Sequence, residues 1–255
     1  MTIVTDPHAR LARLTALTDR ALAGEETGEA PFDALRLVAA ESGLPHGFAR
    51  DHIAGFALDA QGWRPASEDD LLRYCYHVAG VVGCMMAVVM GVDPADEDTL
   101  DRACDLGLAF QLANIARDIS EDAGVGRCYL PTQWLEEAGM DADAIMAAAH
   151  RPALTALVAR LTTRAAAFEA SARHGTTALD LRCAWAVLAA AKIYGDIGRK
   201  VAARGERAWD LRVTTSAAEK AGAVMLAGAQ ASARGWLYRG RGVPTPWSRP
   251  RRKCA

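Results

Sequence analysis

Three polar side chains recur at four-residue intervals in the stretch NIARDISED, residues 114–122. They are Asn114, Asp118 and Asp122, and on a helix this spacing places them on one strip. Carboxylates together with an amide oxygen form a hard, all-oxygen site that suits Mg²⁺, which often takes one or two protein carboxylates plus phosphate oxygens of a substrate. Arg117 adds a guanidinium that can contact phosphate through two hydrogen bonds. The strip therefore favours one half of a metal–diphosphate clamp.

A solvated helix end is the competing interpretation of this strip. Asp101 and Asp105 have the same spacing earlier in the helix, so spacing alone decides little. Asp101 lies in the first turn, where the helix dipole favours an anion. The later acids crowd the last turns, where the dipole opposes each of them by about 0.3–1 kcal/mol. Arg117 and Arg127 would neutralise those acids if the end were only solvated.

The elements that must position the strip are helical throughout. Asp98 is the expected N-cap of the helix that carries the strip, since Asp is a favoured residue there. No composition shift or fixed-period repeat divides the chain, so we predict an all-α fold with a single helical domain over residues 1–233. Helical periodicity with Gly-containing breaks appears over residues 6–23, 32–42, 46–60, 68–90, 98–122, 131–138, 151–173, 178–204 and 215–236.

Composition limits the class of protein. The chain has 255 residues, 51% of them hydrophobic, and a formal net charge of -2, which argues against nucleic acid as a partner because a duplex binder needs a basic face. The longest apolar run, Val78–Met90, is shorter than the roughly 20 residues of a membrane span. The N-terminus lacks a signal-peptide pattern, and the six scattered cysteines are typical of reduced thiols. We therefore expect a cytoplasmic location.

A strip of small residues marks the helix expected over residues 68–90. Glycine in a helix interior costs about 1 kcal/mol relative to alanine, so its presence needs a reason. One reason is close packing against another helix; the other is a trough for a long apolar ligand, with Tyr74 near its mouth. An aromatic ring there could stabilise a cation through its face. The sequence leaves both open for the strip Ala79, Gly80, Gly83 and Ala87.

Three motifs resemble the squalene/phytoene synthase family, most closely its bacterial phytoene synthases. They read RYCYHVAGVVG at 73–83, LGLAFQLANIARDISEDAGVGRCYLP at 106–131 and AKIYGDIG at 191–198. The resemblance implies an isoprenoid-synthase-type helical bundle in which two aspartate-rich helices face each other across a central cavity. It also implies a prenyltransferase that uses Mg²⁺ or Mn²⁺ to join two prenyl diphosphates head to head through a cyclopropyl intermediate.

The resemblance also assigns roles to residues. It makes Asn114, Asp118 and Asp122 the metal-binding motif, with both aspartates catalytic, and Tyr74 the aromatic group near the reacting carbons. Without it, Tyr194 would be a core tyrosine and Arg212 a surface arginine. The residues that it implies as contacts for diphosphate or substrate are Gln111, Arg117, Tyr129, Tyr194, Arg212, Val78, Ala79, Val82 and Gly83.

One family feature is missing from this sequence. Family members carry an earlier aspartate-rich DxxxD motif, and residues 1–70 contain no such pair. We therefore expect an N-terminally truncated domain and little or no turnover by these 255 residues alone.

Three functions remain open at this point. The leading one is phytoene synthesis from two geranylgeranyl diphosphates, through prephytoene diphosphate, in carotenoid biosynthesis. The alternatives are a dehydrosqualene or squalene synthase acting on farnesyl diphosphate, and a catalytically dead fragment that binds prenyl diphosphate. The tail at residues 234–255 contains seven basic residues and no acid, so we expect little fixed structure there. Such a tail suggests peripheral contact with the anionic inner face of the cytoplasmic membrane.

Overall fold

The computed structural model describes residues 6–239 and 245–251, and within these ranges it contains helices and no strand. The all-α prediction is confirmed, and each predicted helical range corresponds to observed helix. The α-helices are α1 (Pro7–Leu22), α2 (Ala30–Ser42), α3 (His46–Ala60), α4 (Glu68–Cys75), α5 (Val81–Val89), α6 (Glu97–Gly124), α7 (Thr132–Glu137), α8 (Arg151–Gly175), α9 (Leu181–Arg204) and α10 (Ala217–Leu237).

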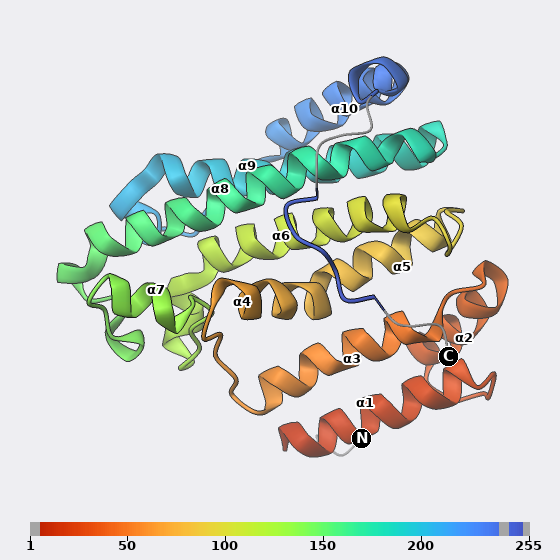
Figure 1. Ribbon diagram of the computed structural model, residues 1–255, viewed down its shortest axis with the longest axis horizontal. Helices are drawn as coiled ribbons and strands as arrows, with labels where there is room; N and C mark the ends of the chain where they lie inside the picture. The colour runs from red at the N-terminus through yellow and green to blue at the C-terminus, as the bar shows by residue number, and fades with distance from the viewer. Residues whose placement is uncertain (1–5, 240–244, 252–255) are drawn as a thin grey trace.

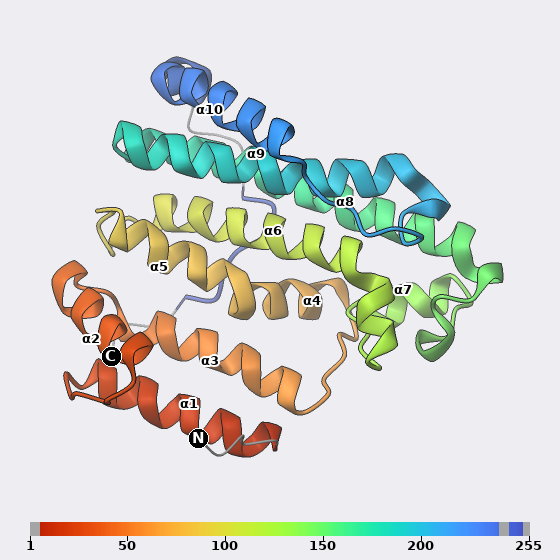
Figure 2. The same cartoon turned by 180° about the vertical axis from the view of Figure 1, so that it is seen from behind.

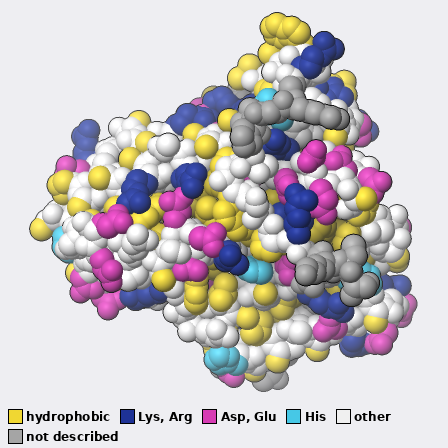
Figure 3. Space-filling model, viewed as in Figure 1, with side chains coloured by type: hydrophobic (Ala, Val, Ile, Leu, Met, Phe, Trp, Pro, Cys, Tyr) yellow, Lys and Arg dark blue, Asp and Glu magenta, His cyan; other side chains and the backbone are white. Residues whose placement is uncertain are grey.

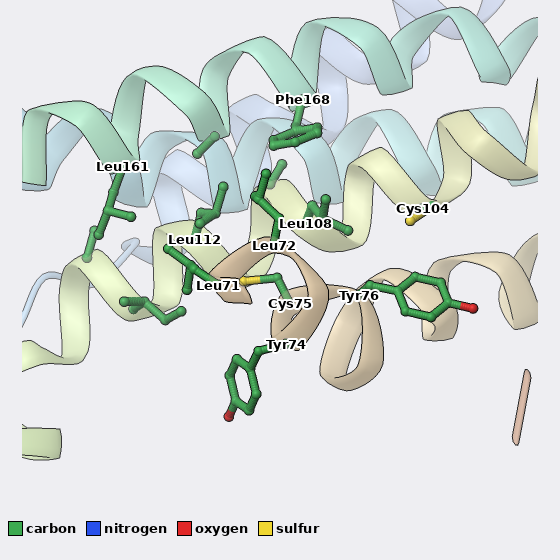
Figure 4. Close-up of a cluster of buried hydrophobic side chains, with 14 of the residues drawn as sticks. Leu71, Leu72, Tyr74, Cys75, Tyr76, Cys104, Leu108, Leu112, Leu161 and Phe168 are labelled. Carbon is green, nitrogen blue, oxygen red and sulfur yellow. The ribbon is translucent and has the colours of Figure 1, made fainter. Parts of the chain in front are cut away.

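Helix α6 lies in the middle of the bundle. Helices α1 to α3 form one edge, α4 and α5 lie beside α6, and α8 to α10 form the opposite edge (Figures 1 and 2). The central position follows from the apolar face of α6, because Leu108, Leu112, Ile115 and Ile119 are all buried. Leu161 and Phe168 of α8 point toward the same core (Figure 4).

The start of α6 differs from the prediction by one capping residue. Asp96, not Asp98, is the N-cap, and its side chain accepts a hydrogen bond from the Thr99 amide at 3.1 Å. Asp98 instead lies in the first turn, where an acid also favours the helix dipole. The two positions satisfy the same preference for acid near a helix N-terminus, so the sequence pattern could not separate them.

The predicted helix over residues 68–90 is interrupted by a π-helical turn. Ser67 caps α4 in a capping box with Asp70, and the π turn η1 (Tyr76–Gly80) then joins α4 to α5. Such turns are frequent at functional sites. Over Glu68–Val89 the stretch has a mean hydropathy of 1.5, and it is the one part of the described chain long and apolar enough to cross a membrane. Half of it is buried within the protein, as in a core helix.

Small residues let this helical stretch pack directly on α6. A Cβ atom added to Gly83 would lie 2.1 Å from the Ala103 carbonyl oxygen. From the other side, a Cβ added to Gly107 would lie 2.2 Å from the Ala79 carbonyl oxygen. Close packing is therefore one reason for the small-residue strip.

The described part of the C-terminal tail lies against the body, whereas the expectation of little fixed structure also covers residues 240–244 and 252–255, which lie outside the described residues. Residues 234–237 continue α10, and residues 245–251 run beside α4 and α6 (Figure 1). Trp247 donates to Asp69 at 2.8 Å, and Arg249 donates to Asp101 at 2.7 Å and also to Glu97. These acids of α4 and α6 therefore hold Trp247 and Arg249 against the body.

Charge is mixed on the molecular surface that faces the viewer in Figure 1. Acidic and basic side chains alternate there, with apolar side chains between them (Figure 3). Ion pairs between exposed side chains, such as Arg73 with Asp69 and Arg64 with Asp143, join many of the charges of the described residues.

Candidate active site

A largely apolar cavity of about 490 Å³ lies between η1, α5, α6, α9 and the end of α8. One wall is formed by Val78, Ala79, Val82 and Gly83, as the resemblance implies. The small-residue strip therefore has both of its suggested roles, because the residues that pack on α6 belong to the same wall. The other predicted residues on the lining are Gln111, Asn114 and Tyr194.

Tyr194 lines this cavity and does not lie in the closed core. Its ring stacks on Phe110 of α6, with ring centroids 4.2 Å apart. Phe110 also lines a second cavity of about 260 Å³ between α6, α8 and α9. Phe110 therefore belongs to the walls of both cavities, and Tyr194 stacks on it from the first cavity.

Asp118 is held by two guanidinium groups. Arg117 donates to both carboxylate oxygens, at 2.6 and 2.5 Å. Arg212 approaches from the loop after α9, with its Nη2 atom 2.8 Å from Asp118 and its Nη1 atom 3.3 Å from Glu121. The structure therefore brings Arg117 and Arg212 together at the acidic strip, although 95 positions separate them in the sequence (212 minus 117).

Asn114 carries a buried amide oxygen without a partner. Its Oδ1 atom is buried and accepts no hydrogen bond, and the residue lines the cavity. Leaving a buried acceptor unsatisfied costs about 1–3 kcal/mol. An oxygen kept in this state is suited to receive a cation or a donor from a ligand.

Asp122 lies in an environment that disfavours its charge. Burial, together with the neighbouring charges of Asp118 and Glu121, raises the pKa of its carboxyl to about 6, although Arg127 lowers it. A cation placed among these acids would reverse that effect, because an opposite charge favours the ionised form.

The donor set fits a divalent metal shared with a diphosphate. The described residues contain no group of three or more His, Cys, Asp or Glu able to hold an ion by themselves. The strip does offer one unsatisfied amide oxygen and two carboxylates, and Mg²⁺ commonly completes such a set with substrate phosphate oxygens. Asn114 lies on the cavity lining, whereas Asp118 and Asp122 continue the strip beyond it.

Tyr74 belongs to an aromatic stack on the other side of α4. Leu71 and Leu72 point toward α6, whereas Tyr74 points away from it (Figure 4). Its ring stacks on Tyr129 at 5.0 Å and on Trp63 at 5.6 Å between centroids. Tyr74 is not among the residues that line the cavity of about 490 Å³, and its place near the mouth of that cavity stays a prediction.

Asp59 is the residue of this cluster that the sequence did not reveal. The hydroxyl groups of Tyr74 and Tyr129 both donate to its Oδ1 atom, each at 3.0 Å. Asp59 also contributes to the raised pKa of Asp122. A lone aspartate near the end of α3 carries no spacing signal, and its partners lie 15 and 70 positions away.

Comparison with known proteins gives a consistent result. The family model described as squalene/phytoene synthase matches residues 1–219. The chain is 47% identical over 225 residues to a 15-cis-phytoene synthase of Pantoea ananas, covering 88% of this chain and 72% of that protein. It is 49% identical over 221 residues to a phytoene synthase of Pseudescherichia vulneris, covering 87% and 71%.

Solved structures of the same type share the fold. A dehydrosqualene synthase crystallised with a ligand has a TM-score of 0.81 at 26% identity, covering 88% of this chain and 79% of that one. A squalene synthase of Alicyclobacillus acidocaldarius has a TM-score of 0.72 at 25% identity, covering 80% and 77%. The isoprenoid-synthase-type bundle is thus confirmed. With most of its length matched by the family model, the chain belongs to the squalene/phytoene synthase family, whose enzymes condense prenyl diphosphates with the help of a divalent metal.

Proposed function

We propose that this protein joins two geranylgeranyl diphosphates head to head and forms phytoene through prephytoene diphosphate. The observation that carries the proposal is the unpartnered Oδ1 atom of Asn114 at an apolar cavity of about 490 Å³. An apolar cavity that meets a strip of oxygen donors suits a ligand with a long hydrocarbon chain and a charged head. Identity of 47% and 49% to phytoene synthases supports this choice of product.

Asn114, Asp118 and Asp122 would hold Mg²⁺ or Mn²⁺ together with the diphosphate. The metal would supply positive charge that stabilises the departing diphosphate. Arg117 and Arg212 bring two guanidinium groups to the same place, where each can donate to a diphosphate oxygen. Their present bonds to Asp118 keep both groups at the strip before a substrate arrives.

The cavity lining would hold the prenyl chain and exclude water. Val78, Ala79 and Val82 offer only apolar side chains, and Gly83 brings the backbone close to α6. Excluding water matters because a carbocation that meets water ends as an alcohol. Gln111 and Tyr194 are among the polar residues of the lining.

A dehydrosqualene or squalene synthase that uses farnesyl diphosphate is the alternative with a specific observation in its favour. The TM-score of 0.81 to a dehydrosqualene synthase supports the same condensation chemistry. The identity to that structure is 26%, well below the identity to the phytoene synthases. This difference favours the longer substrate.

Product analysis tests the proposed function. The protein is incubated with geranylgeranyl or farnesyl diphosphate and Mg²⁺ or Mn²⁺, and the extracted hydrocarbon is identified by chromatography and mass spectrometry. Phytoene is expected; a shorter hydrocarbon from farnesyl diphosphate would establish the alternative. Because residues 1–70 contain no DxxxD pair, the same assay is run with a relative's aspartate-rich helix fused in front.

Two further outcomes of this assay are informative. If neither form makes hydrocarbon, but a non-reacting geranylgeranyl thiodiphosphate binds only with Mg²⁺, the protein is a prenyl-diphosphate-binding protein. Absence of both product and metal-dependent binding would refute the proposal.

We also propose a cytoplasmic location with peripheral contact at the inner face of the cytoplasmic membrane. Helix α10 exposes apolar side chains, including Met225 at 74% and Trp236 at 78%. Trp247 and Arg249, by contrast, are engaged inside the protein. Co-sedimentation with anionic vesicles should therefore fall on changing Met225 and Trp236 to serine. Equal sedimentation of the substituted and original chains would contradict contact through α10.

A further inference from the structure

We propose that Asp59 is a positioning residue that fixes the stacked rings of Tyr74 and Tyr129 in the site. The proposal rests on the proposed function, since it concerns the aromatic group expected near the reacting carbons. It adds a third carboxylate to the site, from a helix other than α6.

One carboxylate oxygen joins two separate segments of the chain. Tyr74 lies on α4 and Tyr129 in the loop after α6, and both hydroxyl groups donate to Oδ1 of Asp59 at 3.0 Å. The two rings are stacked with an interplanar angle of 19°, and Trp63 stacks on the outer face of Tyr74 at 23°. Asp59 thus determines where both hydroxyl groups point.

Hydrogen bonds to an ionised acceptor are roughly twice as strong as neutral ones. They are also sheltered here, because Tyr74 is 3% and Tyr129 is 9% exposed. Burial raises the pKa of both tyrosines, so that both hydroxyl groups stay protonated and remain donors. A ring held at its oxygen and stacked on both sides has little freedom to turn.

The orientation has a chemical consequence for a reaction through carbocations. Each hydroxyl group donates to Asp59, so the hydroxyl lone pairs and the face of the Tyr129 ring that is not stacked on Tyr74 are left for a ligand. A phenol that donates to a carboxylate becomes more electron-rich, which strengthens its attraction for a cation. The stacked rings would therefore present a negative electrostatic potential to a carbocation and no hydroxyl hydrogen directed at it. This suits a carbocation that must not react before the product forms.

The chain contains a matched control on the same helix. Asp51, two turns before Asp59 on α3, accepts a hydrogen bond from the hydroxyl group of Tyr76 at 2.8 Å. Tyr76 is 1% exposed and so equally buried. It does not stack on Tyr74 or Tyr129 and is no part of the proposed site.

The experiment compares Asp59→Ala, Asp59→Asn and Asp51→Ala with the unsubstituted chain. Near-ultraviolet circular dichroism reports the stacked Trp63, Tyr74 and Tyr129, and thermal unfolding reports the fold. Asp59→Ala should lose a large part of the aromatic signal that Asp51→Ala retains. Asp59→Asn keeps an acceptor oxygen in the same place and should preserve most of the signal.

Steady-state kinetics with geranylgeranyl diphosphate and Mg²⁺, measured on whichever form makes hydrocarbon in the product assay, give a second, independent reading. Misplacing a group by about 1 Å can cost on the order of 100-fold, so kcat should fall about 10–100-fold in Asp59→Ala, with a much smaller change in KM. Asp59→Asn should recover only part of this loss, because it keeps the acceptor oxygen but not the charge. A merely structural role would lower the melting temperature without such a split between kcat and KM.

The two proposals fail in different ways. Absence of both hydrocarbon and metal-dependent binding in every form of the protein would refute the proposed function, while the dichroism comparison would still decide the role of Asp59. Equal aromatic spectra for Asp59→Ala and Asp51→Ala would overturn the positioning role. If Asp59→Ala does not fold, the spectrum of Asp59→Asn decides. A kept aromatic signal supports the positioning role of Asp59. Loss of the stack although the acceptor remains overturns that role.

Discussion

Arg117 holds the carboxylate of its sequence neighbour Asp118 through two hydrogen bonds, at 2.6 and 2.5 Å. Asp122, one turn further along α6, forms no ion pair among the described residues, and burial raises its pKa to about 6. Two aspartates of one motif therefore contribute to stability with opposite signs. Asp118 is stabilised by its partners, whereas the charge of Asp122 costs free energy in the absence of a cation.

The first prediction concerns these two aspartates without metal. The pKa of Asp122 is raised from 3.8 to about 6, so protonation of Asp122 favours the folded protein. The folded protein therefore loses stability as the pH rises through this range. At pH 8, Asp122→Asn should raise the free energy of unfolding by on the order of 1 kcal/mol. Asp118→Asn should lower it at the same pH. Urea unfolding at pH 5 and pH 8 measures both effects; a gain for Asp118→Asn would contradict the ion pairs.

The second prediction separates binding from folding at Asn114. Replacing Asn114 by leucine removes a buried unsatisfied oxygen, so the melting temperature should stay equal or rise. The stabilisation by Mg²⁺ with geranylgeranyl thiodiphosphate should be lost, because the amide oxygen is a proposed ligand. Thermal melts with and without these additions provide the measurement. Undiminished stabilisation by the additions would remove Asn114 from the site.

The fold could be predicted because the signals are local. Periodicity and glycine breaks predicted the helices, and Ser67, a favoured N-cap residue type, caps α4. The strip on α6 and the lining residues near Val78 follow a helical period or a family motif, so their places on α6 and in the cavity wall could be anticipated. The π turn at Tyr76–Gly80 could not, because no residue type marks it.

Contacts between segments far apart in the sequence could not be predicted from the sequence. Asp59 meets Tyr129 across 70 positions, and Arg249 meets Asp101 across 148. Nothing in the type or spacing of a single carboxylate indicates such a partner. The basic tail illustrates the same limit. Its composition does not indicate that Arg249 pairs with Glu97 and Asp101 of α6.

The third prediction separates packing from lining on the α5 wall. A Cβ atom at position 83 would lie 2.1 Å from the backbone of Ala103, so Gly83→Ala should destabilise the protein by about 1–3 kcal/mol. Val82→Phe should instead narrow the cavity and shift the preference toward farnesyl diphosphate, since Val82 lines the cavity. Melting temperatures and competition between the two substrates give the comparison. A Val82→Phe protein with unchanged preference would show that the prenyl chain lies elsewhere.

The fourth prediction uses the buried carboxyl group of Asp105. It is 2% exposed, and burial raises its pKa to about 7, although Ser171 and Arg102 lower it. Its folded pKa lies above the ordinary aspartate value of 3.8, so Asp105 contributes a loss of stability as the pH rises from about 4 through 7. Asp105→Asn should remove that loss, on the order of a few kcal/mol at pH 8 and little at pH 4. Equal slopes of unfolding free energy against pH for both proteins would contradict the raised pKa.

The fifth prediction compares two arginines that bind the same carboxylate. Arg249 and Arg251 both donate to Asp101, at 2.7 and 2.8 Å, but their side chains are 4% and 55% exposed. Removing one partner of a buried pair costs about 3–5 kcal/mol, because a charge remains without compensation, whereas an exposed pair contributes about 0–1 kcal/mol. Arg249→Ala should therefore lower the melting temperature strongly and Arg251→Ala only slightly. Small and equal effects would show that residues 245–251 are not held against α6 in solution.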